Sequence, residues 1–553
     1  MLAAHQHRSS TVLFGFVVLG GVTVWTGLHV IRAMEYDAEA KSRLSIVWST
    51  IFLAVLLQTV LYHLDRPRRL TPRIARQLAD LRTAILMPVY NEDPGLLKLG
   101  LESFLRQTRL PDAVHVVDDG SKNSADLEGV RRWWEQAARA AGVRTTWQRT
   151  PNGGKRHAQA AGVRQAPDAD VFITCDSDSC FAPNAIEEIL TPFARPRVQS
   201  VAGIVVATNN RKNVLARITD LWFTTSQLVD RSGQSAVGAV TVNSGPLAAY
   251  RADILRDNLD SYLNEVFLGR PVMFSDDSLL TLYAQERGLT VQQPSAIVFS
   301  AMPEKWSHFV RMYLRWMRGS AIRSIWRMRY LPVNRPAFWM HLVRWIQVLI
   351  TQMVLVWMLV VEPLAYGNRP PASMLWIPFL MGWAQGLRYL SIIRSDERIR
   401  SRIATWLMMP LAIVMAWTLL RWLRWWGVLT CRKTGWGTRE NGAEVSLSGA
   451  EAEQLTGAVP VHAYERYAGP EFEEYAGPGH AEVDDASPEY AGAEYAGARY
   501  GGRPSPTAPP WEVPAPGPYD ASGSNGPYGP YGPPVRDDET MRIPQYRPMA
   551  HSW

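Results

Sequence analysis

Residues 174–179, Thr-Cys-Asp-Ser-Asp-Ser, directly follow the apolar run Val171–Ile173, a pattern that predicts a buried strand ending in a polar loop. Asp176 and Asp178 stand two positions apart, so their carboxylates can share one divalent cation, and Mg²⁺ and Mn²⁺ prefer such oxygen ligands. A cation bound in this way keeps open positions that phosphate oxygens can fill. Because an isolated Asp-x-Asp is more often a solvated acidic loop, the prediction of a metal and diphosphate site depends on the motifs around it.

Around this loop, residues 84–303 alternate short apolar runs with helix-like stretches. The predicted strands are Ala84–Val89, Ala113–Val117, Val171–Thr174, Val198–Ala207 and Ala296–Phe299. The predicted helices include Gly95–Gln107, Leu127–Ala141 and Ala185–Pro192. Alternation of this kind predicts an α/β domain with a mostly parallel sheet covered on both faces, whose sites collect beyond the carboxyl ends of the strands.

Three motifs suit a nucleotide diphosphate. Met87–Glu92 closes the first predicted strand and Val116–Ser121 closes the second, where an acidic pair can accept hydrogen bonds from a uracil ring or ribose hydroxyls. On its own, Asp-Asp-Gly-Ser is an ordinary turn. Asn152–His157 is a Gly-rich turn that carries Lys155 into a helix, where backbone N–H groups and the ammonium group can bind phosphate. Its spacing is not that of a Walker loop, which argues against an NTPase.

Two later motifs suit an acceptor and a base. Asn243–Leu247 is a small-residue turn where a chain-like substrate can approach the backbone. Asp276 and Asp277 follow the apolar residues Val272 and Met273, and one carboxylate beside another has a raised pKa, as a general base near neutrality needs. The same pair also suits the charged first turn of a helix, so both interpretations stay open.

Residues 305–330 carry aromatic and Met side chains on one side of a predicted helix and arginines on the other. The residues that recur at helical spacing are Trp306, Phe309, Tyr313, Trp316 and Met317. This pattern predicts an amphipathic helix at the lipid headgroups. Membrane anchoring alone is a sufficient explanation for Arg323, Arg327 and Arg329.

Apolar segments flank the central domain. Residues 12–31 and 44–64 are each near the length of a bilayer span and predict a membrane hairpin, with a buried helical pair as the alternative. Segments 338–362, 372–393 and 404–426 follow the domain, and Pro410 allows a re-entrant or broken last span. The arginines just beyond residue 64 place the domain in the cytoplasm of a multi-pass inner- or plasma-membrane protein.

Composition narrows the range of partners. The 553-residue chain has a formal net charge of +7 and an isoelectric point near 9.2, and its arginines beside apolar segments favour lipid headgroups and nucleotide phosphates over nucleic acid. Cys175, Cys180 and Cys431 are too few for a disulfide framework and lack zinc-site spacing.

Residues 446–553 repeat Tyr-Ala-Gly in a Pro- and Gly-rich segment, which predicts a disordered tail with no assigned partner.

Taken in order, these motifs resemble those of the processive family 2 glycosyltransferases, which include hyaluronan, chitin and cellulose synthases and the nodulation chitooligosaccharide synthases. The resemblance covers roughly residues 44–439, and the matching segments are Pro88–Glu92, Asp118–Ser121, Gly154–His157, Asp176–Asp178, Ser244–Leu247, Asp276-Asp277, Arg315-Trp316 and Trp436–Arg439. Ser-Gly-Pro-Leu, Lys-Arg-His-Ala and Gly-Trp-Gly-Thr-Arg are most similar to the hyaluronan synthase branch.

The resemblance implies a cytosolic GT-A domain joined to an α-helical transmembrane channel. The implied segments are a hairpin at 1–66, the GT-A domain at 80–304, interfacial helices at 305–335, a transmembrane region with a gating segment at 336–440 and the tail at 446–553.

The resemblance also implies a role for each matched residue. The residues implied to hold a UDP-sugar donor are Tyr90, Glu92, Asp118, Asp119, Lys155, Asp176, Arg315, Arg318, Trp436 and Arg439. Asp176 and Asp178 are implied to hold Mg²⁺ or Mn²⁺. Asp277, beside Asp276, is the implied catalytic base, while Arg315 stabilises the diphosphate and Trp316 stacks on the acceptor sugar. The implied acceptor site also includes Ser244, Gly245 and Pro246.

Several positions depart from the family pattern. Met312 stands where a Gln begins the family's Gln-x-x-Arg-Trp, and Arg311 replaces the Gln often found before it. Ser275 and Ser278 replace the Gly and Arg that commonly bracket the acidic pair in hyaluronan synthases. These departures concern acceptor placement more than donor chemistry.

The prediction is therefore a membrane-embedded, inverting glycosyltransferase that polymerises UDP-sugars into a β-linked polysaccharide, hyaluronan-like or containing N-acetylglucosamine, and exports it. One alternative is a single-transfer enzyme that modifies a lipid or short glycan, which Met312 favours. Another is an inactive membrane scaffold, against which the carboxylates of Asp176, Asp178 and Asp277 argue.

Overall fold

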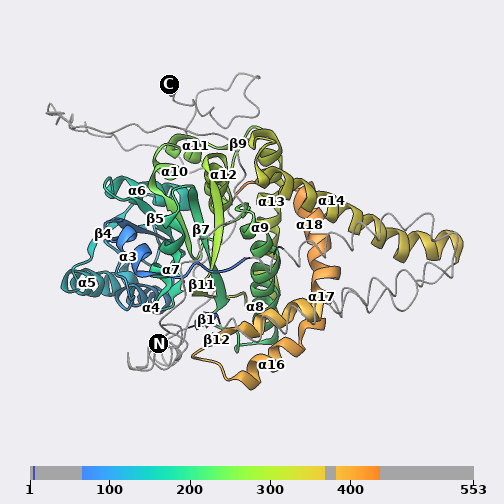
Figure 1. The fold of residues 1–553 in the computed structure, drawn as a ribbon, viewed down its shortest axis with the longest axis horizontal. Coiled ribbons are helices and arrows are strands. Elements are labelled where there is room, and N and C mark those ends of the chain that lie inside the picture. Colours follow the sequence, from blue (N-terminus) through green and yellow to red (C-terminus); the bar gives the residue numbers. More distant parts are fainter. Residues whose placement is uncertain (1–3, 7–60, 62–64, 368–381, 436–553) are drawn as a thin grey trace, which may run out of the picture. The chain divides into compact units, whose positions relative to one another are not determined.

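The structure is a computed structural model that describes residues 4–6, 61, 65–367 and 382–435 (Figure 1). All of these belong to one compact unit, Met1–Gly457 with Glu539–Trp553, whereas the second unit, Ala458–Asp538, lies outside the described residues. The predicted hairpin, apart from Leu61, the gating segment Trp436–Arg439 and the tail also lie outside them.

The described chain is built around an eight-stranded sheet with the order β4-β3-β2-β5-β8-β7-β11-β6. Its strands are β2 (Thr83–Val89), β3 (Ala113–Asp118), β4 (Arg144–Arg149), β5 (Val171–Thr174), β6 (Cys180–Phe181), β7 (Val198–Ala207), β8 (Ala248–Arg251) and β11 (Leu289–Ser300). All run in one direction except β8 and β6. The predicted α/β domain is confirmed, and β8 is an antiparallel strand that the alternation of segments did not predict.

Both faces of the sheet are covered, as predicted. Successive side chains of a strand point to opposite faces, and along β2 Ile85 and Met87 join one buried cluster while Ala84 and Leu86 join another. The first cluster includes side chains of α4 (Pro94–Leu105), α5 (Ser124–Ala140) and α7 (Ala185–Leu190). The second includes those of α6 (Lys155–Gln165), α10 (Ala252–Arg256), α11 (Leu259–Leu263) and α12 (Asp276–Arg287).

The strand register aligns the polar loops at one edge of the sheet. Val89 pairs with Asp118, and Thr174 pairs with Leu86 on one side and with Ala248 on the other. Because β8 is antiparallel, its amino end lies at the same edge as the carboxyl ends of β2, β3 and β5. The three acidic loops and the Ser-Gly-Pro turn before β8 therefore meet at this edge.

Beyond the sheet, α13 (Trp306–Tyr330) leads into α14 (Pro336–Val356) and a π-helical segment, η3 (Trp357–Tyr366). The remaining helical segments are α3 (Pro72–Leu78), η1 (Thr191–Ala194), α8 (Val214–Ser226), the π-helical η2 (Gln227–Arg231), α9 (Ser232–Ala236), η4 (Leu387–Ser391), α16 (Ile399–Leu407), α17 (Met409–Met415), η5 (Ala416–Leu420) and α18 (Arg421–Leu429). Four short strands complete the list: β1 (Ala4–Gln6) pairs with β12 (Ile392–Arg394), and β9 (Val266–Phe267) pairs with β10 (Arg270–Pro271).

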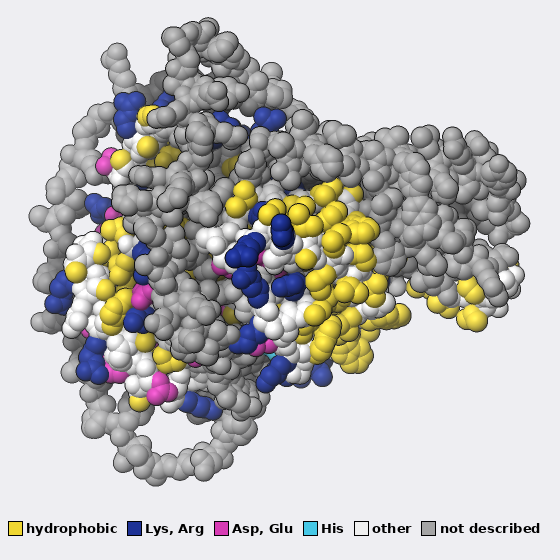
Figure 2. Space-filling model, turned by 90° about the horizontal axis from the view of Figure 1, so that it is seen from below, with side chains coloured by type: hydrophobic (Ala, Val, Ile, Leu, Met, Phe, Trp, Pro, Cys, Tyr) yellow, Lys and Arg dark blue, Asp and Glu magenta, His cyan; other side chains and the backbone are white. Residues whose placement is uncertain are grey.

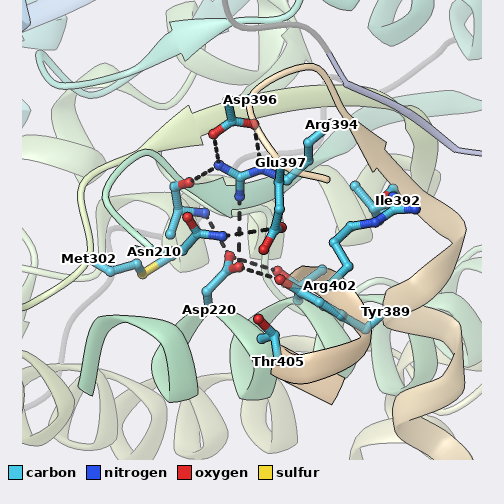
Figure 3. A network of polar contacts seen from close by, with 12 residues as sticks. Asn210, Asp220, Met302, Tyr389, Ile392, Arg394, Asp396, Glu397, Arg402 and Thr405 are labelled. Atoms are coloured by element: carbon cyan, nitrogen blue, oxygen red, sulfur yellow. Dashed lines mark hydrogen bonds and ion pairs between the residues drawn. The ribbon is translucent and has the colours of Figure 1, made fainter. Parts of the chain in front are cut away.

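A buried polar network joins the segment 389–405 to α8 (Figure 3). Asp220 of α8 accepts a hydrogen bond from the Tyr389 hydroxyl at 2.9 Å and faces Arg394 Nη1 at 3.8 Å. Arg394 also donates to both carboxylate oxygens of Asp396, at 2.9 and 2.7 Å, and to the carbonyl oxygen of Ala207 at 2.7 Å. Segment 389–405 is therefore anchored to α8 and β7 by side chains that are mostly buried, while Asp396 is 20% exposed.

Exposed apolar side chains follow α14 and α16–α18, among them Trp339, Met353, Leu407, Leu411, Trp422 and Leu429. Figure 2 shows hydrophobic side chains gathered in one broad patch beside a group of Lys and Arg. Within the described residues no single helix has the length and apolarity of a bilayer span; Ile399–Leu407 and Met409–Leu429 qualify only as a pair, bent by 41°.

Candidate active site

A cavity of about 660 Å³ opens at the edge where the polar loops meet. Its lining includes the predicted residues Tyr90, Glu92, Asp119, Lys155, Asp176, Asp178, Ser244, Gly245, Pro246, Asp276, Asp277, Arg315 and Trp316. Asp118 and Arg318 are described but do not line it, and Trp436 and Arg439 lie outside the described residues. The structure thus brings motifs that are up to 226 positions apart in the chain into one cavity (316 − 90).

Lys155 connects two of the acidic motifs. It is the first residue of α6, and its Nζ lies 2.7 Å from Asp176 Oδ1 and 3.0 Å from Asp276 Oδ2. Burial by itself lowers the pKa of Lys155, but the two carboxylates outweigh burial and raise it above the usual value. The ammonium group therefore stays charged at neutral pH, as binding of a diphosphate requires.

Asp119 supports the loop that precedes Lys155. Its two carboxylate oxygens accept hydrogen bonds from the backbone N–H groups of Gly153, at 2.9 Å, and Gly154, at 2.8 Å. Gly154 has φ +89°, a conformation that favours glycine. These two N–H groups, predicted as phosphate donors, are thus directed to Asp119. Burial raises the pKa of Asp119, and the two hydrogen bonds partly oppose that effect.

Asp118 lies behind Asp119 and shapes the turn between β3 and α5. Its Oδ1 accepts a hydrogen bond from the N–H of Ser121 at 2.8 Å, and its Oδ2 faces Arg149 Nε at 3.6 Å. This side chain is buried and holds the turn that presents Asp119.

The Asp176–Asp178 loop suits a divalent cation that also binds substrate. Asp178 Oδ2 accepts long hydrogen bonds, both 3.3 Å, from Ser300 Oγ and the Ala301 N–H, and the side chain lines the cavity. Between the two aspartates, Ser177 donates its hydroxyl to the buried carboxylate of Glu92. Among the described residues no cluster of three or more His, Cys, Asp or Glu could hold a metal by itself. A cation here needs diphosphate oxygens and water to complete its coordination, as Mg²⁺ sites in phosphoryl enzymes do.

The acidic pair Asp276-Asp277 forms the first turn of α12, as one interpretation of the sequence expected, and both residues also line the cavity. Ser275, just before the helix, has φ +61° and turns the pair toward the site. Burial alone would raise the pKa of Asp276, but Lys155 holds it below the usual value. Burial and the negative charge of Asp276 raise the pKa of Asp277 to about 7. Two adjacent carboxylates are thereby differentiated into a charged partner for Lys155 and a proton acceptor.

The Ser-Gly-Pro turn packs directly on the Lys155–Asp176 pair. A Cβ atom at Gly245 would lie 3.1 Å from Asp176 Oδ2 and 3.3 Å from Lys155 Nζ, so glycine leaves this approach open. Ser244 Oγ accepts a hydrogen bond from Arg231 Nη1 at 2.7 Å. Arg231 ends the π-helical segment η2, which turns Gln227, Asp230 and Arg231 toward the cavity.

Aromatic side chains form the opposite wall. Trp316 of α13 stacks on Phe223 of α8, with ring centroids 5.5 Å apart and an interplanar angle of 22°. Tyr313 contacts Trp316 edge-on at 6.5 Å. Met312 is buried and lines the cavity beside them. This wall presents flat apolar surface, on which sugar rings can stack.

The assignment of Arg323 and Arg327 to membrane anchoring is wrong. Both are buried: Arg323 pairs with Glu265, and Arg327 donates to the Thr241 carbonyl oxygen and, at 3.1 Å, to Ser278 Oγ. Their partners lie 49 to 86 positions earlier in the chain, so helical periodicity alone could not reveal them. On this helix Arg323 and Arg327 thus dock on the preceding domain, while Trp306, Ile325 and Met328 are exposed.

Glu265 is a buried carboxylate that the sequence analysis did not single out. It pairs with Arg156 Nη2 at 2.8 Å and with Arg323, and it accepts a hydrogen bond from Trp326 Nε1 at 2.8 Å. Burial alone would raise its pKa, but the two guanidinium groups lower it to about 2. Glu265 thus connects the helix that carries Lys155 to the helix that carries Trp316.

Comparisons with known proteins identify the family of this chain. Residues 81–319 match the model of the family described as "Glycosyltransferase like family 2". The chain is similar to a hyaluronan synthase of Streptococcus pyogenes, with 32% identity over 364 residues, 65% of this chain and 84% of the relative. It is also similar to an N-acetylglucosaminyltransferase of Rhizobium meliloti (strain 1021), with 32% identity over 238 residues, 43% of this chain and 55% of the relative.

Among solved structures, a mannosyltransferase of Pyrobaculum calidifontis in complex with GDP-Man and Mn²⁺ aligns at a TM-score of 0.43 and 17% identity, covering 67% of this chain and 97% of that one. That likeness is distant, whereas the sequence similarity is extensive. With the family model spanning the sheet, and a relative matched over 84% of its length, the chain belongs to the family 2 glycosyltransferases.

Proposed function

We propose that this protein is a membrane-associated, inverting glycosyltransferase that transfers sugar from a UDP-sugar, with Mg²⁺ or Mn²⁺, onto a growing β-linked glycan. The observation that carries the proposal is the arrangement around Lys155, whose Nζ lies within 3.0 Å of both Asp176 and Asp276, with Asp277 next in the chain. A phosphate-binding cation, candidate metal ligands and a base of suitable pKa thus line one cavity.

The donor would lie against the loops at the strand ends. Tyr90 and Asp119 line the end of the cavity nearest β2 and β3, where the uridine would sit, while Lys155 and Arg315 carry positive charge for the diphosphate. Asp176 and Asp178 would hold the cation, which neutralises charge on the leaving diphosphate when bound. Glu92 keeps the loop of the two aspartates in place through Ser177.

The acceptor would enter between Trp316 and the Ser-Gly-Pro turn. In the proposed step Asp277 removes the proton from an acceptor hydroxyl, and the oxygen attacks the anomeric carbon on the face opposite the diphosphate. The bond from that carbon to the diphosphate oxygen breaks, UDP leaves with the electron pair, and the proton stays on Asp277. An α-linked donor thereby gives a β-linked product.

Polymerisation and export at the inner or plasma membrane are part of the proposal. The similarity to a protein named hyaluronan synthase supports a hyaluronan-like product, and the similarity to an N-acetylglucosaminyltransferase supports N-acetylglucosamine as one donor sugar. The apolar segments beside the catalytic domain and the exposed apolar patch support contact with the bilayer. Thr434 accepts a hydrogen bond from the N–H of Met273 at 3.2 Å, which brings the chain to the mouth of the site just before the proposed gating segment Trp436–Arg439.

Met312 favours a second candidate function, a single transfer to a lipid or short glycan. This buried side chain lines the cavity where related polymerases carry a glutamine amide. A thioether offers the glycan little hydrogen bonding.

Washed membranes with Mg²⁺ or Mn²⁺ and radiolabelled UDP-sugars, supplied singly and in pairs, test both candidates. High-molecular-weight product that needs UDP-N-acetylglucosamine and UDP-glucuronate together, and that specific glycan hydrolases digest, supports a hyaluronan-type polymerase. Polymer from one donor indicates a chitin- or cellulose-type product. Short or lipid-extractable products support the single-transfer enzyme, and no transfer from any UDP-sugar contradicts the proposed function.

A further inference from the structure

A buried ionic cluster lies behind the acid pair Asp276-Asp277, outside the cavity. Arg156, the residue after Lys155, is 4% exposed and does not line the cavity. Its Nη2 lies 2.8 Å from Glu265 Oε2, and Glu265 also pairs with Arg323. The side chains of Glu265 and Arg323 are fully buried. Two guanidinium groups thus share one carboxylate, which leaves one positive charge for other partners.

Arg156 holds the chain just before the acid pair. Its Nη2 donates to the carbonyl oxygen of Phe274 at 2.7 Å, and its Nη1 donates to that of Tyr262 at 3.1 Å. Phe274 is buried and precedes Ser275, whose left-handed conformation turns the pair toward the site. Because a charged donor fixes the Phe274 carbonyl group, Arg156 limits how the turn at Ser275 can rotate.

The remaining positive charge acts on Asp276. Burial alone would raise the pKa of Asp276, but Lys155 and then Arg156 lower it. Gln159, one turn after Lys155 in α6, donates to Asp276 Oδ2 at 3.4 Å. Burial and the ionised Asp276 in turn raise the pKa of Asp277 to about 7. The charge on Arg156 therefore reaches the base through its neighbour.

The charged and titratable groups around the acid pair come from several elements. They are Lys155 and Arg156 of α6, Asp176 after β5, Arg231 of η2, Tyr250 of β8, Tyr262 of α11 and Arg327 of α13. Of the four cations in this set, three line the cavity, where donor, acceptor and metal approach them, and Arg156 does not. Its influence on the base is thus a fixed property of the folded protein.

We propose that Arg156 is a positioning residue for the catalytic base, and that Glu265 holds Arg156 in this role. Arg156 fixes the turn that presents Asp277 and keeps a positive charge behind Asp276. Glu265 also accepts a hydrogen bond from Trp326 Nε1 at 2.8 Å, so one carboxylate connects this support to α13, the helix of the aromatic wall. This inference rests on the proposed function, since Asp277 is the base of that reaction.

The pH dependence of transfer tests this role, because the two partners should shift it in opposite directions. Arg156→Met removes a positive charge and makes ionisation of the pair less favourable, so the acidic limb of kcat/KM should move up from pH 7 by about one pH unit. Glu265→Gln removes a negative charge, so the limb should move down by about half a pH unit. A purely structural role would lower the rate in both variants without opposite shifts.

The assay measures transfer from labelled UDP-N-acetylglucosamine, with UDP-glucuronate and Mg²⁺ present, by the full-length protein in washed membranes between pH 5 and 9. UDP binding over the same range shows which variants are folded. The double variant Arg156→Met/Glu265→Gln keeps the net charge of the cluster and replaces the buried pair by neutral side chains, so its limb should return to pH 7.

Two further variants separate charge from position. Arg156→Lys keeps the charge but cannot make the forked contact with Glu265 and Phe274, so its limb should stay near pH 7 while kcat falls by about tenfold. This conservative variant tests the proposal even where Arg156→Met or Glu265→Gln fails to fold. Arg164→Met removes an exposed arginine of the same helix, and it should leave both the limb and the rate unchanged.

Each outcome gives a distinct answer. Absence of transfer from any UDP-sugar by the unaltered protein contradicts the proposed function itself. Normal transfer by the unaltered protein, with limbs that stay in place or move in the same direction in Arg156→Met and Glu265→Gln, overturns the role of Arg156 while leaving the proposed function intact. A kcat of Arg156→Lys equal to that of the unaltered protein overturns the positioning of the turn.

Discussion

The two ends of the cavity are built in different ways. At the donor end, Asp119 and Asp176 come from loops at the edge of a sheet, Lys155 begins the helix α6 beside them, and strand register sets the spacing of the loops. At the acceptor end, Trp316, Arg327 and Arg344 come from helices whose mutual packing sets their positions. Sheet register is shared by every strand and is hard to change locally, whereas one substitution in a helix can alter a side chain without moving its neighbours. The donor chemistry is thus the constrained part of the molecule, and product identity is the adjustable part.

Removal of the base should produce the largest effect at the donor end. Asp277→Asn is expected to lower kcat by about a hundredfold to ten-thousandfold, the usual contribution of a general base, while UDP affinity stays unchanged. Transfer assays with isothermal titration of UDP measure both quantities. Asp253→Asn alters a carboxylate that is 54% exposed, and it should be inert. If Asp277→Asn keeps an activity close to that of the unaltered protein, Asp277 is not the catalytic base.

The pH dependence should follow the same carboxylate. Since the pKa of Asp277 is raised to about 7 and only its ionised form accepts a proton, activity should be lost as pH falls through 7. A single titration lowers kcat/KM to about one-hundredth of its plateau at pH 5. UDP affinity measured over the same range separates the base from the donor site. A flat profile from pH 5 to 8 would contradict this role for Asp277.

Removal of the contact that holds the Asp176–Asp178 loop should have an effect of intermediate size, a lower rate at low concentrations of the cation. Glu92→Gln keeps the shape but replaces a carboxylate that holds Ser177, so we expect the Mn²⁺ concentration at half-maximal rate to rise by about tenfold to a hundredfold. Glu128→Gln, at a side chain that is 48% exposed, is the matched control. An unchanged Mn²⁺ dependence in Glu92→Gln would mean that the loop does not depend on this contact.

A methyl group added in the Ser-Gly-Pro turn should have a smaller effect, which is expected on KM for the donor. Gly245→Ala places a methyl group 3.1 Å from Asp176 Oδ2, and we expect KM for the donor to rise about tenfold. Gly129→Ala adds the same methyl group in the middle of α5, where no atom lies within 4 Å, and it should leave KM unchanged. Equal KM values for the two variants would show that the turn can shift to accommodate the added methyl group.

A change at the acceptor end should alter the product more than the rate. Met312→Gln introduces the amide of related polymerases at nearly equal volume, so the initial rate should stay within about twofold of the parent. Product length on a gel should increase because the amide can hydrogen-bond the glycan. Shorter product with the same rate would reverse the expected direction and separate this enzyme from those polymerases.

The difference between the edge of the sheet and the packed helices also explains which features the sequence could predict. Val171–Thr174 and Val198–Ala207 are strands at their predicted limits because these mostly apolar runs are buried on both faces. The strands β8 and β4 were not predicted. The sequence of β8, Ala-Ala-Tyr-Arg, has little strand propensity, and β4 is the polar segment Arg144–Arg149 at the edge of the sheet. The donor motifs follow strands in the chain and could be located. Arg323 and Arg327 could not be interpreted correctly, because their partners Glu265 and Thr241 are distant in sequence.

The network around Asp220 has a consequence for how the protein is made. Asp220 is fully buried, and its hydrogen bond from Tyr389 spans 169 positions of the chain. While the ribosome has not yet released Tyr389 and Arg394, this carboxylate has only the hydrogen bonds from the Ala207 N–H and the Thr224 hydroxyl to offset its burial. The catalytic domain can therefore reach its final packing only after the intervening apolar segment has been synthesised. Synthesis of the segment between α8 and Tyr389 thus precedes completion of the catalytic domain, and a nascent chain stalled before residue 389 would be held in an unfinished, inactive state.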